Sequence, residues 1–195
     1  MKIAAFIIVG LVSAAGLAQV TSGQPGDAGR NTPSWNLEKK SHLGIEGYDP
    51  VSYFPEGGGT PAKGDKAIST EYRGAVYYFT STAHRDAFVA DPAKYEPAYG
   101  GWCAWAMREG EKVEVDPKSF IVKDGRLFLF YDGILANTRS KWLKGDHAAE
   151  SAAADASWLK LSGEAARMPA AHTLKSQLDA TRQKMSSAQI GRAHV

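Results

Sequence analysis

The alternation of apolar and polar residues predicts two β-hairpins in the middle of the chain. The first joins residues 69–72 to residues 76–80 through Arg73-Gly74-Ala75, a short link that contains glycine. The second joins residues 119–122 to residues 126–131, two runs of β-branched and aromatic side chains around Lys123-Asp124-Gly125. Asp-Gly is the strongest short hairpin signal that a sequence carries. Both hairpins are therefore predicted from their turn residues and the strand residues beside them.

A further strand is predicted at residues 51–54, a short apolar and aromatic run that follows Pro50. The residue before a proline is pushed into an extended conformation, which favours a strand at this point. Together with the two hairpins, this segment predicts a small, mostly antiparallel sheet of four to five strands. The fold class is α+β, with short packed helices and C-terminal helices around the sheet.

Helical spacing follows the strands in three places. Ser81 is a good N-cap for a helix over residues 82–90, which Asp91-Pro92 ends. Its inward positions are Ala83, Ala87 and Phe88. Residues 134–143 and 147–161 are also expected to be helical, with glycines at 145 and 163 as stops. The apolar anchors of these two helices are Trp142, Trp158 and Leu159.

The N-terminal segment has the features of a signal peptide. Lys2 precedes an apolar run over residues 3–17, and Gly16 and Ala18 are small residues placed for cleavage after Ala18. The run is shorter than the ~20 apolar residues that span a bilayer, so we expect no stable membrane insertion after cleavage. No cysteine follows for lipid attachment. These features predict a bacterial periplasmic or secreted protein with a signal peptide at residues 1–18.

The rest of the chain divides into a lead-in, one domain and a tail. Residues 19–36 are rich in Gly, Ser, Pro and Asn and predict a flexible lead-in. Residues 37–162 are expected to form the single domain. For residues 163–195, an amphipathic helix and a disordered tail remain open alternatives. Residues 190–195 match the translation of a common sequencing adapter, so we interpret them as a non-native sequence artefact.

Charge excludes one class of partner. Of 23 basic and 21 acidic residues, six basic and two acidic ones lie in Lys2 and in the segment from Glu164 onward, which leaves 17 and 19 between them. A nucleic-acid-binding domain needs clustered Lys and Arg to neutralise phosphates. The middle of the chain has no such cluster, so we expect no nucleic-acid partner.

Several motifs in one order resemble the YHS-domain family over roughly residues 44–131. They are GYDPVSYF at 47–54, YRG at 72–74, YYF at 77–79, the helical HRDAF at 84–88, DPAKY at 91–95 and YGGWCA at 99–104. The resemblance implies a fold and suggests metal binding, without a reaction. In the metal-binding members, cysteines follow the Asp-Pro-Val motif and flank the end of the Tyr-Tyr-Phe strand. Here those positions hold Ser52, Thr80 and His84. The two hydroxyls are poor ligands for soft metals, and only His84 keeps the chemistry of a metal ligand.

A second candidate constellation lies around Cys103. Gly100-Gly101 is expected to open a short helix through residues 102–107 that ends at Gly110, with Cys103 and Met107 on one face. A thiol in the first helical turn favours the thiolate, and thiolate with thioether is a soft pair suited to Cu(I). His84 lies at another helix start, where the helix dipole favours the neutral imidazole that a metal needs. Cys103, Met107 and His84 are therefore the candidate metal ligands, with copper favoured.

Plainer interpretations of the same residues remain open. Cys103 is the only cysteine, so it is a buried apolar filler, an intermolecular cross-link or a functional thiol. Met107 fits core packing, and His84 fits an ordinary partly buried or surface histidine. Asp49 and Asp116 each precede a proline, where a capping or turn carboxylate is expected rather than a catalytic one. No Ser-His-Asp spacing, phosphate loop or paired carboxylate motif is present, so no catalytic residue is assigned.

Three functions remain compatible with the sequence. The first is an exported YHS-type protein that binds a soft or borderline metal ion, with copper favoured. The second is a non-metal protein-interaction or structural module. A weaker third is a thiol-dependent enzyme with Cys103 as nucleophile and His84 as base. The distance and exposure of the sulfur and imidazole distinguish them, because a Cys103 sealed under the neighbouring tryptophans leaves only the module.

Overall fold

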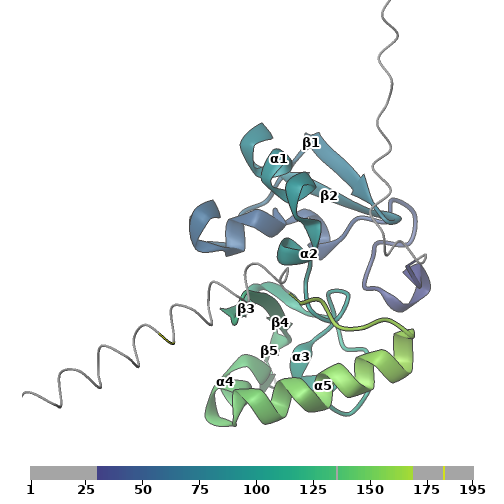
Figure 1. The fold of residues 1–195 in the computed structure, drawn as a ribbon, viewed down its shortest axis with the longest axis vertical. Coiled ribbons are helices and arrows are strands. Elements are labelled where there is room, and N and C mark those ends of the chain that lie inside the picture. Colours follow the sequence, from purple (N-terminus) through teal and green to yellow (C-terminus); the bar gives the residue numbers. More distant parts are fainter. Residues whose placement is uncertain (1–29, 135, 169–181, 183–195) are drawn as a thin grey trace, which may run out of the picture.

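The structure is a computed structural model that describes residues 30–134, 136–168 and 182. Figure 1 shows a hairpin of β1 and β2 with α1 in the upper part of the molecule, and β3, β4 and the helices α3, α4 and α5 in the lower part. The short helix α2 lies between them. The expected signal peptide at 1–18, the first part of the lead-in and nearly all of the tail, with residues 190–195, lie outside the described residues.

The first predicted hairpin is confirmed. Strand β1 spans Asp65–Tyr72 and pairs antiparallel with β2, Ala75–Phe79, with Tyr72 opposite Ala75. The two linking residues, Arg73 and Gly74, have φ of 51° and 81°. Positive φ at both central positions is what a tight hairpin turn with right-handed strand twist requires. β1 is longer than expected because the pairing resumes at Asp65 beyond a bulge.

The strand expected at residues 51–54 was wrong. Pro50–Tyr53 is instead the 3-10 helix η3, the third of four short 3-10 helices between residues 30 and 60. Asp49 Oδ1 accepts a hydrogen bond from Val51 N at 2.9 Å, and Pro50 has the fixed φ that suits a helix start. Asp49 and Phe54, each of which precedes a proline, are extended, whereas Pro50–Tyr53 are helical. The other 3-10 helices are η1 (Thr32–Ser34), η2 (Ile45–Gly47) and η4 (Pro55–Gly57).

The first predicted helix is confirmed with one correction. Helix α1 spans Thr82–Ala90, and Ser81 Oγ accepts from His84 N at 3.1 Å as its N-cap. Phe88 is fully buried, but Ala83 is exposed, because the helix packs through a narrower face than we expected. Asp91 ends α1, and Pro92 begins the short helix α2, Pro92–Tyr95.

The second predicted hairpin is also confirmed, and it carries the centre of the core. Strand β3, Asp116–Lys123, pairs with β4, Arg126–Phe130, through a turn in which Asp124 and Gly125 have φ of 53° and 72°. Every residue of β4 is buried. Leu127 and Leu129 belong to the hydrophobic cluster under β1 and β2, whereas Phe128 and Phe130 belong to the cluster under α5. Because side chains alternate along a strand, β4 joins the two clusters.

The α+β class is confirmed, but a single sheet of four to five strands is not. Within the described residues, the strands form three antiparallel sheets of two strands each: β1–β2, β3–β4 and β5–β6. The second edge of β4 is met only by isolated bridges from Pro97 and Cys103. These two residues belong to irregular backbone that cannot continue a ladder, so the hairpins pack together without joining into one sheet.

The first of the two C-terminal helices begins later than we expected. Asp132–Gly133 pairs with Ala136–Asn137 in the small hairpin β5–β6. Because β6 lies where we expected helix, α4 spans only Thr138–Lys144. Asn137 Oδ1 accepts from Ser140 N at 2.7 Å and fixes this start. Helix α5 spans His147–Ser162 and ends at Gly163 as predicted. Trp142 and Trp158 are buried, as predicted. Leu159 is 53% exposed, so the prediction that it anchors the helix was wrong.

The packed domain extends beyond both expected boundaries. Trp35 is buried and meets Trp158 edge to face at 6.1 Å between ring centroids. Arg30 and Ala166 are buried as well. Residues 30–36 are therefore part of the fold and not of a flexible lead-in, and the fold continues past residue 162. The short helix α3, Ala104–Met107, packs against α5 in the same part of the molecule.

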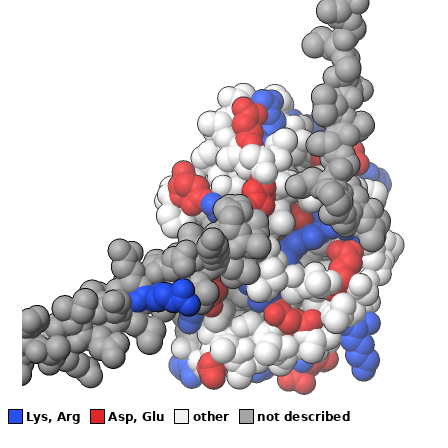
Figure 2. All heavy atoms as spheres, in the orientation of Figure 1, with Lys and Arg blue, Asp and Glu red and all other residues white. Residues whose placement is uncertain are grey.

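The surface carries both charge signs. On the face drawn in Figure 2, Lys and Arg side chains are interspersed with Asp and Glu, so no continuous basic surface is presented there. Among the helices that the structure describes, none has the length and apolar character needed to cross a bilayer.

Candidate functional site

The most organised polar constellation joins His84 to a buried carboxylate. His84 Nδ1 lies 2.6 Å from Asp49 Oδ2, and the Asp49 side chain is completely buried. Thr80 donates to the same oxygen through its backbone N at 2.9 Å and its hydroxyl at 2.8 Å. The other carboxylate oxygen caps η3 through Val51 N. Asp49 therefore ties η3, the end of β2 and helix α1 together at one point.

Local signals place each member of this group. Asp49 precedes Pro50 at the start of η3, which is the capping role that we expected for it. Thr80 follows β2, and Ser81 then opens α1 so that His84 projects from its first turn. Ser52 also turns to this region, because its hydroxyl donates to the backbone carbonyl of Asp49 at 2.7 Å. The three positions that the YHS resemblance associates with metal ligands thus all contact Asp49.

The hydrogen bonds fix the tautomer of His84. An ionised carboxylate only accepts, so Nδ1 carries the proton that it shares with Asp49. In the neutral ring, Nε2 is then the nitrogen with a free lone pair. The His84 side chain is 22% exposed. This arrangement, a histidine oriented by a buried carboxylate, is common among metal ligands and proton acceptors.

Cys103 lies in a sealed position. The helix that we expected from residue 102 begins later, at Ala104, and Cys103 is its N-cap residue without a side-chain cap bond. Its exposed fraction is 0%. Tyr131 N donates to Sγ at 3.3 Å, and Thr138 Oγ1 lies 3.3 Å from the same sulfur. The thiol thus serves as a partner for two polar groups of the chain interior.

Met107 is one turn from Cys103, as expected, but it is also fully buried. Met107 N donates to Cys103 O at 3.0 Å, and the side chain belongs to the cluster of aromatic residues under α5. Neither sulfur takes part in the Asp49–His84 group, whose hydrogen bonds come from η3, β2 and α1. In residues 30–134 and 136–168, no group of three or more His, Cys, Asp and Glu side chains is placed to hold a metal ion.

The environment of Cys103 leads to a prediction about stability and labelling. Thiol reagents should not modify Cys103 in the native protein, because the sulfur is inaccessible. Cys103→Val should lower the free energy of unfolding by about 1–3 kcal/mol, because Tyr131 N–H loses its acceptor in a buried site. Cys103→Ser should cost less, because a hydroxyl can accept from Tyr131 and bond to Thr138. Native and denatured thiol titrations with urea unfolding curves test this, and rapid native labelling would contradict it.

The sequence did not predict two buried polar networks, one around Asp49 and one around Glu96. The pairing of Asp49 with His84 spans 35 positions. Glu96, which is also buried, contacts Arg30, Tyr77 and Arg167. The only available signal was the Asp-Pro motif at Asp49, which indicates a capping carboxylate but not its histidine partner. For Glu96, no signal in the sequence indicates burial.

Comparisons of the chain with protein-family models, with curated proteins and with solved structures found no significant match. The likeness to YHS domains therefore rests on the order of its motifs.

Proposed function

We propose that this protein is an exported, YHS-type binding protein that holds a borderline metal ion, with copper favoured, at Nε2 of His84. The observation that carries the proposal is the 2.6 Å contact between His84 Nδ1 and the fully buried Asp49. A carboxylate on one ring nitrogen orients the imidazole and makes the other nitrogen a stronger ligand. Imidazole suits Cu and Zn among the first-row metals.

The residues differ in how well they fit a metal. The His84 side chain is 22% exposed, whereas Cys103 and Met107 are sealed in the core, where the Cys103 sulfur already accepts a hydrogen bond from Tyr131 N. Water completes the coordination around one protein ligand, which gives exchangeable rather than permanent binding. The proposal therefore assigns the ion to His84, as Cu(II) or Zn(II), and assigns packing to the two sulfur side chains.

Metal titration of the mature chain without the non-native segment, residues 19–189, tests this assignment. We expect one Cu(II) ion to bind with a Kd on the order of 1–100 μM. His84→Gln should weaken binding at least about tenfold, which corresponds to the loss of about 1.4 kcal/mol or more. His42→Gln, which removes an exposed histidine elsewhere, should leave the Kd unchanged, and so should Cys103→Ser.

The opposite pattern would overturn the assignment. Loss of binding in Cys103→Ser with retention in His84→Gln would place the ion at the thiol. Equal Kd values in His84→Gln and the wild type would exclude His84 as the metal ligand. Asp49→Asn offers a second measurement, because loss of an orienting carboxylate commonly costs about 10–100-fold in metal affinity. Its circular dichroism spectrum must match that of the wild type, since Asp49 also caps η3.

A second candidate, a non-metal interaction module, is favoured by a different observation. Two adjoining hollows flank residues 37–39 on a surface that does not include His84. A thiol enzyme is not supported, because Cys103 and His84 have separate sets of hydrogen-bond partners.

A further inference from the structure

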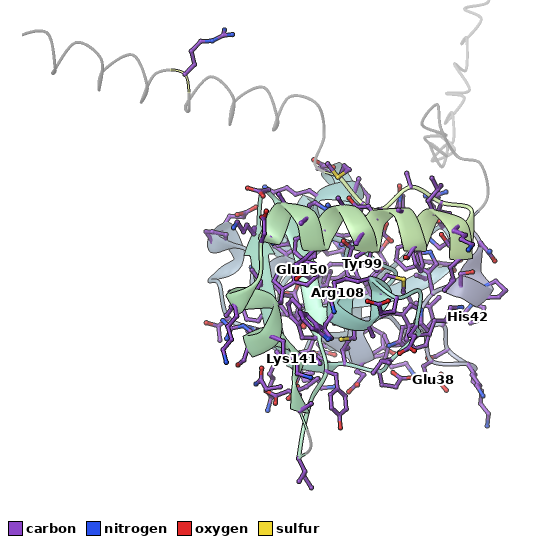
Figure 3. All side chains as sticks on the ribbon, turned by 90° about the horizontal axis from the view of Figure 1, so that it is seen from below. Glu38, His42, Tyr99, Arg108, Lys141 and Glu150 are labelled. Carbon is purple, nitrogen blue, oxygen red and sulfur yellow. The ribbon has the colours of Figure 1, made fainter. Side chains whose placement is uncertain are left out.

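A hydrogen bond from an indole to a histidine closes the corner between α4 and α5. Trp142 belongs to α4, and His147 is the first residue of α5. Trp142 Nε1 donates to His147 Nδ1 at 2.9 Å across the two-residue link between the helices. In Figure 3, Lys141 of α4 and Glu150 in the first turn of α5 mark the two helices that meet here. This bond, the α4–α5 latch, ties the end of one helix to the start of the next.

The latch requires a neutral imidazole. An indole N–H only donates, so Nδ1 of His147 must offer its lone pair. The proton of the neutral ring is then on Nε2, which lies 3.5 Å from Asp124 Oδ2. In the imidazolium form both ring nitrogens carry protons, and two donors would face each other at the contact with Trp142. Protonation of His147 and the latch therefore exclude each other.

The surroundings of His147 favour the neutral form. Its side chain is only 14% exposed, and its ring packs edge to face against Phe128 at 5.2 Å between centroids. It also stands at the start of a 16-residue helix, where the helix dipole disfavours a cation. Burial is the largest of the causes that act on this ring, and it lowers the pKa of His147 below its ordinary value.

The charges near this ring oppose one another. Lys123 and Arg126, from the two strands of the second hairpin, lower the pKa of the imidazole, whereas Asp124 and Asp146 raise it. Asp146 is already engaged as the N-cap of α5. The Asp124 side chain is 69% exposed, so solvent screens its charge. With two charges of each sign, no fixed counterion is ready for an imidazolium at the latch.

A hollow of about 330 Å³ adjoins the latch, and His147 lines it. Helix α4 contributes Trp142 and Leu143 to its lining. Glu150, further along α5, is paired with Arg108 instead. The hollow gives a protonated ring room to turn toward water, whereas the opposite side of the ring is packed.

We propose that His147 is an acid-sensitive switch that opens the corner between α4 and α5. When the ring takes a proton from the solvent at Nδ1, the latch breaks and the imidazolium turns into the hollow toward Asp124 and Asp146. The indole N–H of Trp142 then lacks an acceptor until water enters, which loosens α4. The switch does not involve His84 or a metal ion.

Acid should therefore weaken the native state. The unfolded chain binds the proton with the ordinary histidine pKa of about 6.5, whereas the folded chain binds it less readily. The contribution of His147 to stability is complete above that ordinary value and is lost as the pH falls through the range between the two pKa values. A single proton changes the unfolding equilibrium constant by at most about tenfold per pH unit.

NMR of the mature chain, residues 19–189, tests the latch in the unmodified sequence. At neutral pH, His147 should carry its proton on Nε2, and its titration midpoint should lie below the ordinary histidine value. The indole N–H resonance of Trp142 should shift with the same midpoint. Trp102 is the matched control, because its indole donates to Ser34 O at 2.7 Å, an acceptor that does not titrate. A proton on Nδ1 at neutral pH, or a Trp142 resonance that does not follow His147, would overturn the proposal.

Urea unfolding over the same pH range tests the consequence for stability. His147→Gln keeps an acceptor for the indole but does not titrate, so acidification should cost this variant less stability than the wild type. His42→Gln, which removes an exposed histidine, should keep the pH dependence of the wild type. In His84→Gln the Trp142 resonance should still shift with pH, because the switch is separate from the proposed metal site. Equal pH dependence in His147→Gln and the wild type would show that His147 does not sense acid.

Discussion

Replacing Glu96 with glutamine should lower the free energy of unfolding by about 3–5 kcal/mol, the usual cost of removing one partner from a buried ion pair. The side chains of Glu96 and Arg30 are both completely buried, with Oε1 2.5 Å from Arg30 Nη2. Arg167 Nε lies 2.9 Å from the other oxygen. Without the negative charge, the guanidinium group of Arg30 would remain completely buried without its ion-pair partner.

Tyr77 reinforces the same network. Its hydroxyl donates to Glu96 Oε1 at 2.8 Å. Burial raises the pKa of Tyr77 well above its ordinary value, and the charge of Glu96 raises it further. Tyr77 therefore stays protonated and remains a donor at neutral pH. Glu96 thus links residues from before the first hairpin and from after α5 to the core.

Urea unfolding measures the effect of this substitution. Glu109→Gln is the matched control, because Glu109 is exposed, and it should change stability by less than about 0.5 kcal/mol. The double variant Glu96→Gln with Arg30→Met should be less destabilised than the sum of the two single variants, since the two side chains contact each other. A loss below about 1 kcal/mol for Glu96→Gln would mean that water or rearrangement compensates the arginines.

Gly100→Ala should destabilise the protein by about 2–4 kcal/mol, because a positive φ and a steric clash add at this position. Gly100 has φ of 61°. A Cβ atom there would lie 2.8 Å from Trp158 and 3.0 Å from Trp35. Both rings are buried and pack edge to face, so neither can move without opening the core.

Gly110 provides a control that separates the two causes. Its φ is 75°, but a Cβ atom would meet nothing within 4 Å. Gly110→Ala should therefore cost only about 1 kcal/mol, the strain of the left-handed conformation. Thermal unfolding of both variants measures the difference. Equal losses would show that backbone strain alone accounts for Gly100 and that the tryptophans make room.

The elements that the sequence determined are those with short-range causes. Arg73-Gly74 and Asp124-Gly125 specify their hairpins because the turn residues themselves adopt positive φ. Ser81 specifies the start of α1 through a bond to His84 N, three residues away. Such signals need no knowledge of the rest of the fold.

Prediction failed where two local signals competed or where burial depended on packing. At residues 51–54, aromatic and apolar side chains favoured a strand, but the Asp49 cap and Pro50 favoured the helix η3. Ala136–Asn137 forms the strand β6 where we expected helix, and Asn137 caps α4, which begins at Thr138. Ala83 and Leu159 have apolar side chains but face solvent, since the faces of α1 and α5 are chosen by their neighbours.

The candidate sites were decided almost entirely by the tertiary structure. The sequence indicated that Asp49 is a capping carboxylate and that His84 and Cys103 have ligand chemistry. It did not indicate that Asp49 pairs with His84, or that Cys103 is sealed against Tyr131 and Thr138. A side chain's chemistry determines which partners it can accept, whereas the partner that it meets depends on how distant segments pack. For Asp49 and His84 that partner is 35 positions away, so only the folded chain brings them together.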